Sequence, residues 1–274
     1  MEDLWVYDQV YIDIYNNEIS VGPDDGIEAD FTMHNCRIYR NRITNCGMGL
    51  SSQPTLGGPA YFMYNVMYNI AMCPYKVSRA SRGALFYHNT SVKAGDGFVE
   101  HHGQGAYYRA VFVNNLALGG EGGGPSGRYS SGEDGLAVSL PGFNSTCVFD
   151  YNAVGTVGTP FRGLIGDRTF DDIEGLRRLT GGKNSIRVEF DTFAADVEFP
   201  HPMFERVREP VDLRLSPSSP AVDAGVVLPN INDGFTGKAP DIGAYELGRE
   251  IPHYGPRPPG VDEETEWLKR HAGQ

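Results

Sequence analysis

The sequence has little of what marks membrane, nucleic-acid-binding or disulfide-rich proteins. No apolar run reaches the ~18 residues that a bilayer-spanning helix needs. Basic residues are scarce: 23 Lys and Arg against 35 Asp and Glu leave a formal net charge of -12, which argues against binding to nucleic acid. The 4 cysteines show no metal-site spacing, so we interpret them as small buried apolar residues. What remains is a chain long enough for one large domain.

The chain does contain a short phrase that recurs five times between Asp13 and Leu118. Each copy ends near an asparagine, and the asparagines are 24, 24, 24 and 26 residues apart: Asn17, Asn41, Asn65, Asn89 and Asn115. The residue three positions earlier is apolar in every copy: Ile14, Ile38, Phe62, Phe86 and Phe112. A fixed period of this size predicts a solenoid, in which each repeat buries its apolar face against its neighbours.

The repeats have the composition of short strands. They alternate, are rich in Tyr, Phe, Ile and Val, and are interrupted by Gly, Asn, Asp and Pro, whereas helical periodicity is absent. We therefore predict an all-β fold, a parallel β-helix of ~24-residue coils in which equivalent residues lie ~4.8 Å apart. The asparagines should form one hydrogen-bonded column, and the apolar residues before them a second, buried column.

The rest of the chain divides by composition. Residues 1–163 are predicted to hold the coils, with a Gly-rich surface insertion at 119–142 and a sixth copy of the phrase at Asn152. Residues 164–249 should form a helix-containing excursion, helical from Phe170 to Thr180, and a cap of short strands that closes the solenoid's open end. A Pro-rich tail follows at 250–274. The first residues lack a signal peptide's pattern and enter a coil at once, so we expect further coils upstream.

Several phrases carry a resemblance to a known family: DDGIEAD, LGGPAYFMYNVMYN, GALFYHNTSV, and the closing GLRRLTGGKNS, LSPSSPAVDAG and DIGAYE. Over roughly residues 5–247 the chain resembles right-handed parallel β-helix proteins of the pectin-lyase-like superfamily, in a largely uncharacterised bacterial branch. The resemblance implies a secreted or periplasmic, carbohydrate-active protein. It does not name the reaction, because this superfamily includes polysaccharide lyases, glycoside hydrolases, uronate epimerases and proteins without known activity.

Aligning the coils on their asparagines predicts one outward polar strip. A one-residue slip in the second coil places Ile27, Leu50, Tyr75 and Val99 in an inward column. The strip then has two rows, Glu28, Ser51, Lys76 and Glu100 in the first, and Asp30, Gln53, Ser78 and His102 in the second.

Glu28 and Asp30 are the candidate pair for hydrolysis. Two strand rises should separate their Cα atoms by ~7 Å, within the carboxylate separations of glycosidases. The alternative is an acidic turn that binds Ca²⁺, with Asp24 and Asp25 as ligands, or that only solvates a sheet edge.

Lys76 is the candidate base for a lyase or an epimerase. Abstraction of a proton next to a uronate carboxylate needs a base of lowered pKa, and Ca²⁺ held by carboxylates would stabilise the enolate. Arg79 and Arg82 would bind the substrate carboxylate. The alternative is that Glu100, one coil above, forms a plain surface salt bridge with Lys76.

The remaining strip residues have supporting roles. One of His101 and His102 should face outward, with His102 as an acid–base candidate, although both are also consistent with plain surface histidines. We assign substrate binding to Gln53, Arg79, Arg82, Glu100 and His101.

Three functional hypotheses follow. The first is cleavage of an extended polysaccharide, with hydrolysis ahead of elimination or epimerisation. The second is a non-catalytic glycan-binding or adhesion solenoid, and the third is an inactive piece that lacks half of its site. The expected partner is a poly- or oligosaccharide, bound by a monomer.

Overall fold

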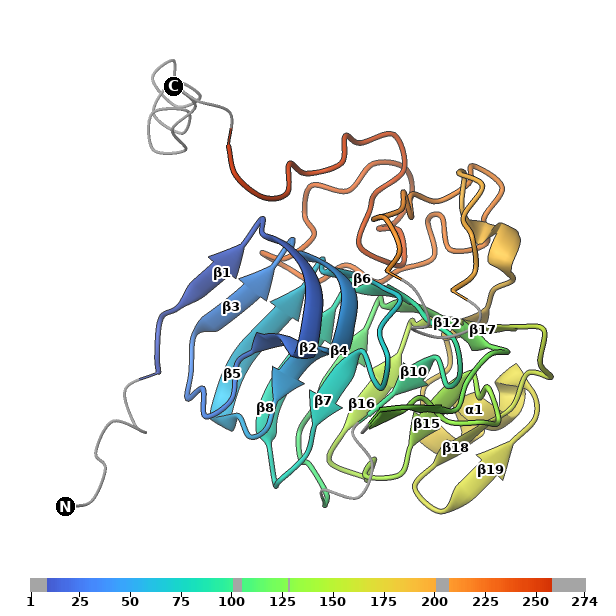
Figure 1. Cartoon of the computed structure of the whole chain (residues 1–274), viewed down its shortest axis with the longest axis horizontal. Helices are drawn as coiled ribbons and strands as arrows, with labels where there is room; N and C mark the ends of the chain where they lie inside the picture. Colours follow the sequence, from blue (N-terminus) through green and yellow to red (C-terminus); the bar gives the residue numbers. More distant parts are fainter. Residues whose placement is uncertain (1–8, 101–104, 128, 201–206, 258–274) are drawn as a thin grey trace.

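The computed structural model describes residues 9–100, 105–127, 129–200 and 207–257. Within these ranges the protein is nearly all-β, and its parallel strands stack as a solenoid of about 6 turns (Figure 1). The predicted fold class is therefore confirmed.

Three main sheets run along the solenoid. The first contains, in spatial order, β1 (Asp13–Tyr15), β3 (Cys36–Tyr39), β5 (Leu56–Met63), β8 (Arg82–Tyr87), β11 (Val111–Val113) and β16 (Val148–Asp150). The second contains β10 (Phe98–Val99), β15 (Val138–Leu140), β18 (Gly163–Ile165) and β19 (Arg168–Phe170), the last antiparallel. The third contains β2 (Glu18–Glu28), β4 (Arg42–Ser52), β6 (Val66–Tyr68), β9 (Thr90–Val92), β12 (Leu116–Gly120), β17 (Ala153–Val157) and β20 (Ile186–Arg187), with β7 (Tyr75–Val77) beside β4.

The asparagines form the predicted ladder. From Asn17 up to Asn115, each donates its backbone N–H and its side-chain Nδ2 to Oδ1 of the asparagine in the next coil, at 2.9–3.1 Å, and the column ends at Asn152. The residue before each asparagine has a left-handed backbone, with φ between 53° and 60°: Asn16, Arg40, Tyr64, His88, Asn114 and Tyr151. The repeated phrase is thus a repeated turn, and its amide satisfies backbone groups there.

The apolar residues three positions earlier form the predicted core column. Phe62, Phe86 and Phe112 are fully buried, and their rings stack at centroid distances of 4.7 and 5.0 Å. Ile38 continues the column downward, while Ile14 in the first coil is only partly buried.

The Gly-rich insertion is shorter than predicted. β15 pairs with β10 inside the second sheet, and Val138 is core, so the chain rejoins the coil before residue 142. The part outside the regular coils, here named the Gly-rich arm, is described at residues 121–127 and 129–135 and contains the antiparallel hairpin β13 (Pro125–Ser126) and β14 (Tyr129–Ser130).

The predicted helix is present as α1 (Ile173–Thr180), which is shorter than the predicted range of Phe170 to Thr180 because Phe170 ends β19 and Asp172 is the N-cap. Asp172 caps its first turn by accepting from Gly175 N at 2.6 Å, and Gly181 ends it with φ 77°. α1 packs against β16, β18 and β19, and so covers the far end of the solenoid (Figure 1). Within the described ranges, no helix has the length and apolarity needed to cross a bilayer.

Residues 207–257, the closing segment, differ from the prediction. They form turns and one isolated bridge in place of short strands, and they lie along the outer face of the third sheet, not across the open end (Figure 1). The reason is that β6, β9 and β12 are buried on both faces, and Val66, Val92 and Leu116 pack outward against Leu213 and Ile242 of this segment. After η2 (Phe190–Thr192), a 3-10 turn, the chain therefore covers a side of the solenoid.

His88 joins the closing segment to the fourth coil through hydrogen bonds. Its Nε2 faces the side-chain amides of Asn114 and Asn232 at 3.0 and 2.8 Å, and both amides are donors. Nε2 must therefore accept, which leaves the proton on Nδ1, and Nδ1 donates to Gly243 O at 3.2 Å.

Candidate functional site

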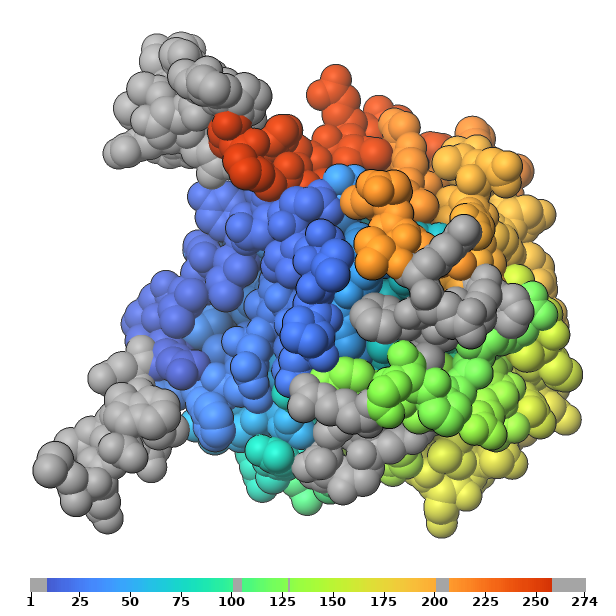
Figure 2. All heavy atoms as spheres, viewed as in Figure 1, coloured from blue at the N-terminus to red at the C-terminus, as the bar shows by residue number. Residues whose placement is uncertain are grey.

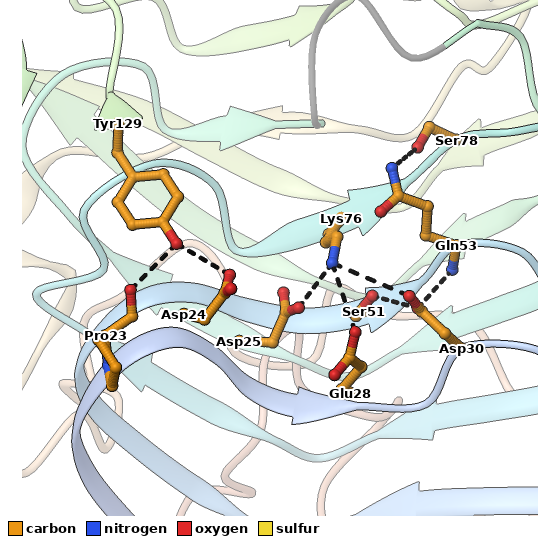
Figure 3. Close-up of polar contacts among 10 residues, drawn as sticks. All are labelled: Pro23, Asp24, Asp25, Glu28, Asp30, Ser51, Gln53, Lys76, Ser78 and Tyr129. Atoms are coloured by element: carbon orange, nitrogen blue, oxygen red, sulfur yellow. Dashed lines mark hydrogen bonds and ion pairs between the residues drawn. The ribbon is translucent and has the colours of Figure 1, made fainter.

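The predicted strip exists where β2, β4 and β7 lie side by side. Glu28 is level with Ser51, and Ser51 with Lys76, and the inward neighbours Ile27, Leu50 and Tyr75 are aligned in the same way. The one-residue slip at Leu50 is thus confirmed, and Lys76 lies above Glu28 and Asp30 (Figure 3).

Lys76 is surrounded by three carboxylates. Its Nζ donates to Asp25 Oδ2 at 2.6 Å and lies 3.9 Å from Glu28 Oε1 and from Asp30 Oδ2 (Figure 3). We name these four residues the Lys76 cluster. The side chains of Asp25, Lys76 and Asp30 are 4%, 10% and 11% exposed, whereas that of Glu28 is 65% exposed. Glu28 is therefore the member that meets solvent.

Asp25 reaches the cluster because β2 carries an irregularity. Between Gly22 and Asp25 the pairing of β2 with β4 shifts register, as at a β-bulge. At Gly26 a Cβ atom would lie 2.4 Å from Ile43 Cγ2, so only glycine lets the strand approach β4 here. This shift is the one-residue slip that the sequence alignment required before Leu50, although the alignment did not show that the slip would bring Asp25 to Lys76.

Asp30 is fixed by two donors. Its Oδ1 accepts from Ser51 Oγ and from Gln53 N, the latter at 2.8 Å (Figure 3). The side-chain amide of Gln53 is buried, and its Nε2 donates to Ser78 Oγ at 2.7 Å. Gln53 therefore holds Asp30 in place, a role that differs from the substrate binding predicted for it.

The two ends of the buried ion pair respond oppositely to burial. Burial raises the pKa of Asp25 to about 6, although the Lys76 ammonium opposes this shift. Burial alone would lower the pKa of Lys76, but the hydrogen bond to Asp25 and the charges of Asp25, Asp30 and Glu28 raise it above its ordinary value. Lys76 is therefore a permanent cation near neutral pH, while Asp25 takes up a proton just below it.

Lys76→Met should raise the pKa of Asp25 above its present value of about 6, because the substitution removes the ammonium and leaves the burial. A carboxyl ¹³C NMR titration measures this pKa. Arg162→Met is the matched control, since Arg162 pairs with Asp134 at an exposed site. An unchanged or lowered Asp25 pKa in Lys76→Met would show that the ion pair does not set it.

Asp24 and Asp25 do not form the predicted calcium site. Asp24 Oδ1 accepts from the Tyr129 hydroxyl at 2.8 Å, and Asp25 is bound to Lys76. In the part of the chain that the structure describes, no group of three or more His, Cys, Asp or Glu could hold a metal ion. The point on which the cluster carboxylates converge is taken by the Lys76 ammonium, so these residues do not fit Ca²⁺.

The prediction that Glu100 lies above Lys76 is wrong. Glu100 forms a parallel β-bridge with Tyr75, so Glu100 and not Val99 takes the inward position of this coil. The coil after Asn89 therefore contains one residue more than the alignment assumed, and Val99 packs with Met48. Glu100 is buried, its Oε1 accepts from Gly142 N at 2.6 Å, and burial raises its pKa to about 7. The 26-residue step after Asn89 was the sequence signal of this extra length.

The other predicted site residues lie elsewhere. Arg79 is exposed in the turn after β7. Arg82 begins β8 in the first sheet and stacks on Tyr108, with its guanidinium carbon 4.5 Å from the ring centroid. Their assignment to substrate binding stays a prediction. His101 and His102 lie outside the described residues.

Sequence reasoning missed Tyr129, which the Gly-rich arm carries to the edge of the cluster. Its hydroxyl donates to Pro23 O at 3.0 Å as well as to Asp24 (Figure 3). Its ring lies against Gly47, where a Cβ atom would be only 2.8 Å from Tyr129 Cε2. A cavity of about 190 Å³ lies at the arm's base, lined by Met72, Asp96, Val99, Glu100 and Ser130–Gly132. No pattern within the arm predicts where its tyrosine lies.

No protein-family model matches this chain, and no curated protein matches it.

Proposed function

We propose that this chain is a carbohydrate-active protein that hydrolyses an extended polysaccharide at the Lys76 cluster. The observation that carries the proposal is that the carboxylates of Glu28 and Asp30 both approach Lys76. Each presents a carboxylate oxygen 3.9 Å from Nζ, so these two oxygens are at most about twice that distance apart. Acid–base pairs of glycosidases span ~5–9.5 Å.

The surroundings give the two carboxylates different tasks. Glu28 extends into solvent, where a polymer lying along the sheet would meet it, and it is suited to protonate the leaving oxygen. Asp30 is held by Ser51 and Gln53, and a fixed carboxylate is suited to orient a water molecule. Lys76 would stabilise negative charge between them. The pectin-lyase-like resemblance, with an extracellular or periplasmic location, is part of this proposal.

Elimination and epimerisation receive less support. With Lys76 as the base, both require its amine without the proton, whereas the hydrogen bond to Asp25 and the surrounding carboxylates raise the pKa of Lys76 and keep it charged.

The second candidate function is glycan binding without turnover. The burial of Asp25, Asp30 and Lys76 favours this function, because only Glu28 in the cluster has a side chain more than half exposed and so within easy reach of a polymer. In that case the cluster ties the first three coils together, and the strip is a binding face only.

Glu28→Gln and Asp30→Asn should each lower turnover by ~10²-fold or more with folding intact, because each removes a proton-transfer role. Acidic and neutral polysaccharides are screened for new reducing ends and for ultraviolet absorbance, which marks the conjugated product of elimination. Glu174→Gln is the control, since Glu174 is an exposed carboxylate on α1. Ultraviolet-absorbing products would contradict hydrolysis, and binding with neither signal would establish the second candidate.

A further inference from the structure

The Gly-rich arm encloses a cavity of about 190 Å³ against the coils, here named the arm cavity. Met72, Asp96, Val99 and Glu100 line it from the coils, and Ser130–Gly132 line it from the arm. Figure 2 shows the arm, in bright green, on the outer surface of the solenoid near the blue coils. The volume equals the share of about six water molecules in the liquid, which is space for one small ring with its substituents.

The backbone around the arm cavity is held by hydrogen bonds that require no ligand. Asp96 N donates to Ser131 O at 2.7 Å, and Gly97 N donates to Leu136 O at 2.8 Å, so both ends of the arm's second half are joined to the turn after β9. Lys93 is fully buried beneath this turn, and its Nζ donates to two of the turn's carbonyl oxygens at 2.7 Å. The cavity is therefore formed in advance, as small-molecule sites usually are.

The lining combines an apolar part with hydrogen-bond acceptors. Met72 and Val99 belong to a small apolar cluster on the outside of the coils. The Asp96 carboxylate lies against Gly132, where a Cβ atom would overlap it, and the Ser130 hydroxyl lies on the arm side. A ligand that fits has an apolar surface and donates hydroxyl hydrogens. A ligand carboxylate would meet the carboxylate of Asp96 and be repelled.

The arm cavity lies on the same outer side of the coils as part of the Lys76 cluster. Asp25 of the cluster is level with Met48 in the second coil. Met48 packs with Met72 of the third coil and Val99 of the fourth. At ~4.8 Å per coil, the cavity lies ~10–14 Å from Asp25 along the solenoid. A polymer bound at the cluster can therefore extend to the cavity.

We propose that the arm cavity binds one uncharged sugar residue of the polysaccharide. The apolar side of the sugar ring lies on Met72 and Val99, and its hydroxyls donate to Asp96 and Ser130. The inference rests on the proposed function for the ligand being a sugar, and it adds that a neutral residue is selected here over a uronate. Because the cavity lies outside the Lys76 cluster, binding in it and turnover are separable.

The test is NMR of the full chain with ¹³C-labelled methionine methyl groups. The probes are neutral tetrasaccharides of glucose, mannose, galactose or xylose, with tetragalacturonate as the acidic comparison. At least one neutral probe should shift the Met72 methyl resonance saturably and show intermolecular NOEs to it, while Met67, in the core, stays unchanged. Tetragalacturonate should bind at least ~10-fold more weakly.

Ser130→Leu should weaken binding of the neutral probe by ~10-fold or more, because the larger side chain takes up part of the cavity. Ser126→Leu is the matched control, since Ser126 lies on the other strand of the same hairpin and outside the described lining. The proposal is overturned if no neutral probe shifts Met72 at ~10 mM, if Ser130→Leu binds as well as Ser126→Leu, or if tetragalacturonate binds equally well.

The same experiment separates this site from the proposed hydrolysis. Glu28→Gln should keep the Met72 shift and lose turnover. A Met72 shift in a wild-type protein without turnover would contradict hydrolysis and support the arm cavity as a sugar site. Turnover of a neutral polysaccharide with no shift at Met72 would support hydrolysis and overturn the arm cavity as a site.

Discussion

Phe86→Ala should lower the free energy of unfolding by about 3–5 kcal/mol. The ring is fully buried, lies between Phe62 and Phe112 in the core stack, and meets Tyr75 edge-on at 5.1 Å. Alanine leaves a cavity that neighbours on adjacent coils cannot fill, because the asparagine ladder fixes the distance between coils.

Denaturant titration measures the loss as a lower midpoint at unchanged slope. Val148→Ala is the matched control: Val148 is 45% exposed on the outer side of β16, and its change should stay within ~0.5 kcal/mol. A loss below ~1 kcal/mol for Phe86→Ala would mean that the column is not a packed core.

Much of the fold was predictable because a solenoid repeats its geometry. Each copy of the phrase makes the same turn, so the positions of Asn65 and Phe62 in one coil predict those of Asn89 and Phe86 in the next. One regular spacing was enough to derive the ladder, the core column and the level of Glu28 with Lys76. The sixth copy at Asn152 followed from the same pattern despite a 37-residue coil.

What could not be predicted depends on contacts between distant, non-repeated segments. Tyr129 meets Asp24 across 105 residues, and Asn232 meets His88 across 144. The closing segment lies where the outward faces of Val66 and Leu116 need cover, which the strand pattern does not reveal. In such segments no neighbouring copy constrains the chain.

The candidate site was half predictable for the same reason. Lys76, Glu28 and Asp30 meet because their strands keep the repeat. Asp25 joins them through an irregularity, and Glu100 leaves them through one extra residue. The repeat therefore predicts the meeting of Glu28, Asp30 and Lys76, whereas departures from the period decide the positions of Asp25 and Glu100.

Lowering the pH should loosen the closing segment through His88. Burial lowers the pKa of His88 from 6.5 to about 4, since its Nε2 is occupied by two amide donors and cannot take a proton without losing them. Between these values the unfolded chain binds the proton and the folded chain does not. The contribution of His88 is therefore fully present above pH ~6.5 and is lost as pH falls toward 4, by about 3 kcal/mol.

The difference between wild type and His88→Gln isolates this effect. Burial raises the pKa values of Asp25 and Glu100, so the folded state takes up their protons at a higher pH than the unfolded state does. Their protonation therefore increases stability as the pH falls, and it does so equally in wild type and in His88→Gln. Unfolding free energies are measured from pH 8 to pH 4, and the wild-type advantage over His88→Gln should shrink across that range. Hydrogen-exchange protection at Gly243 and Asn114, corrected for the slower intrinsic exchange at low pH, should decrease as the pH falls. His253→Gln, at an exposed histidine, should leave the profile unchanged. If His88→Gln keeps the wild-type pH dependence, His88 is not the group whose protonation releases the closing segment.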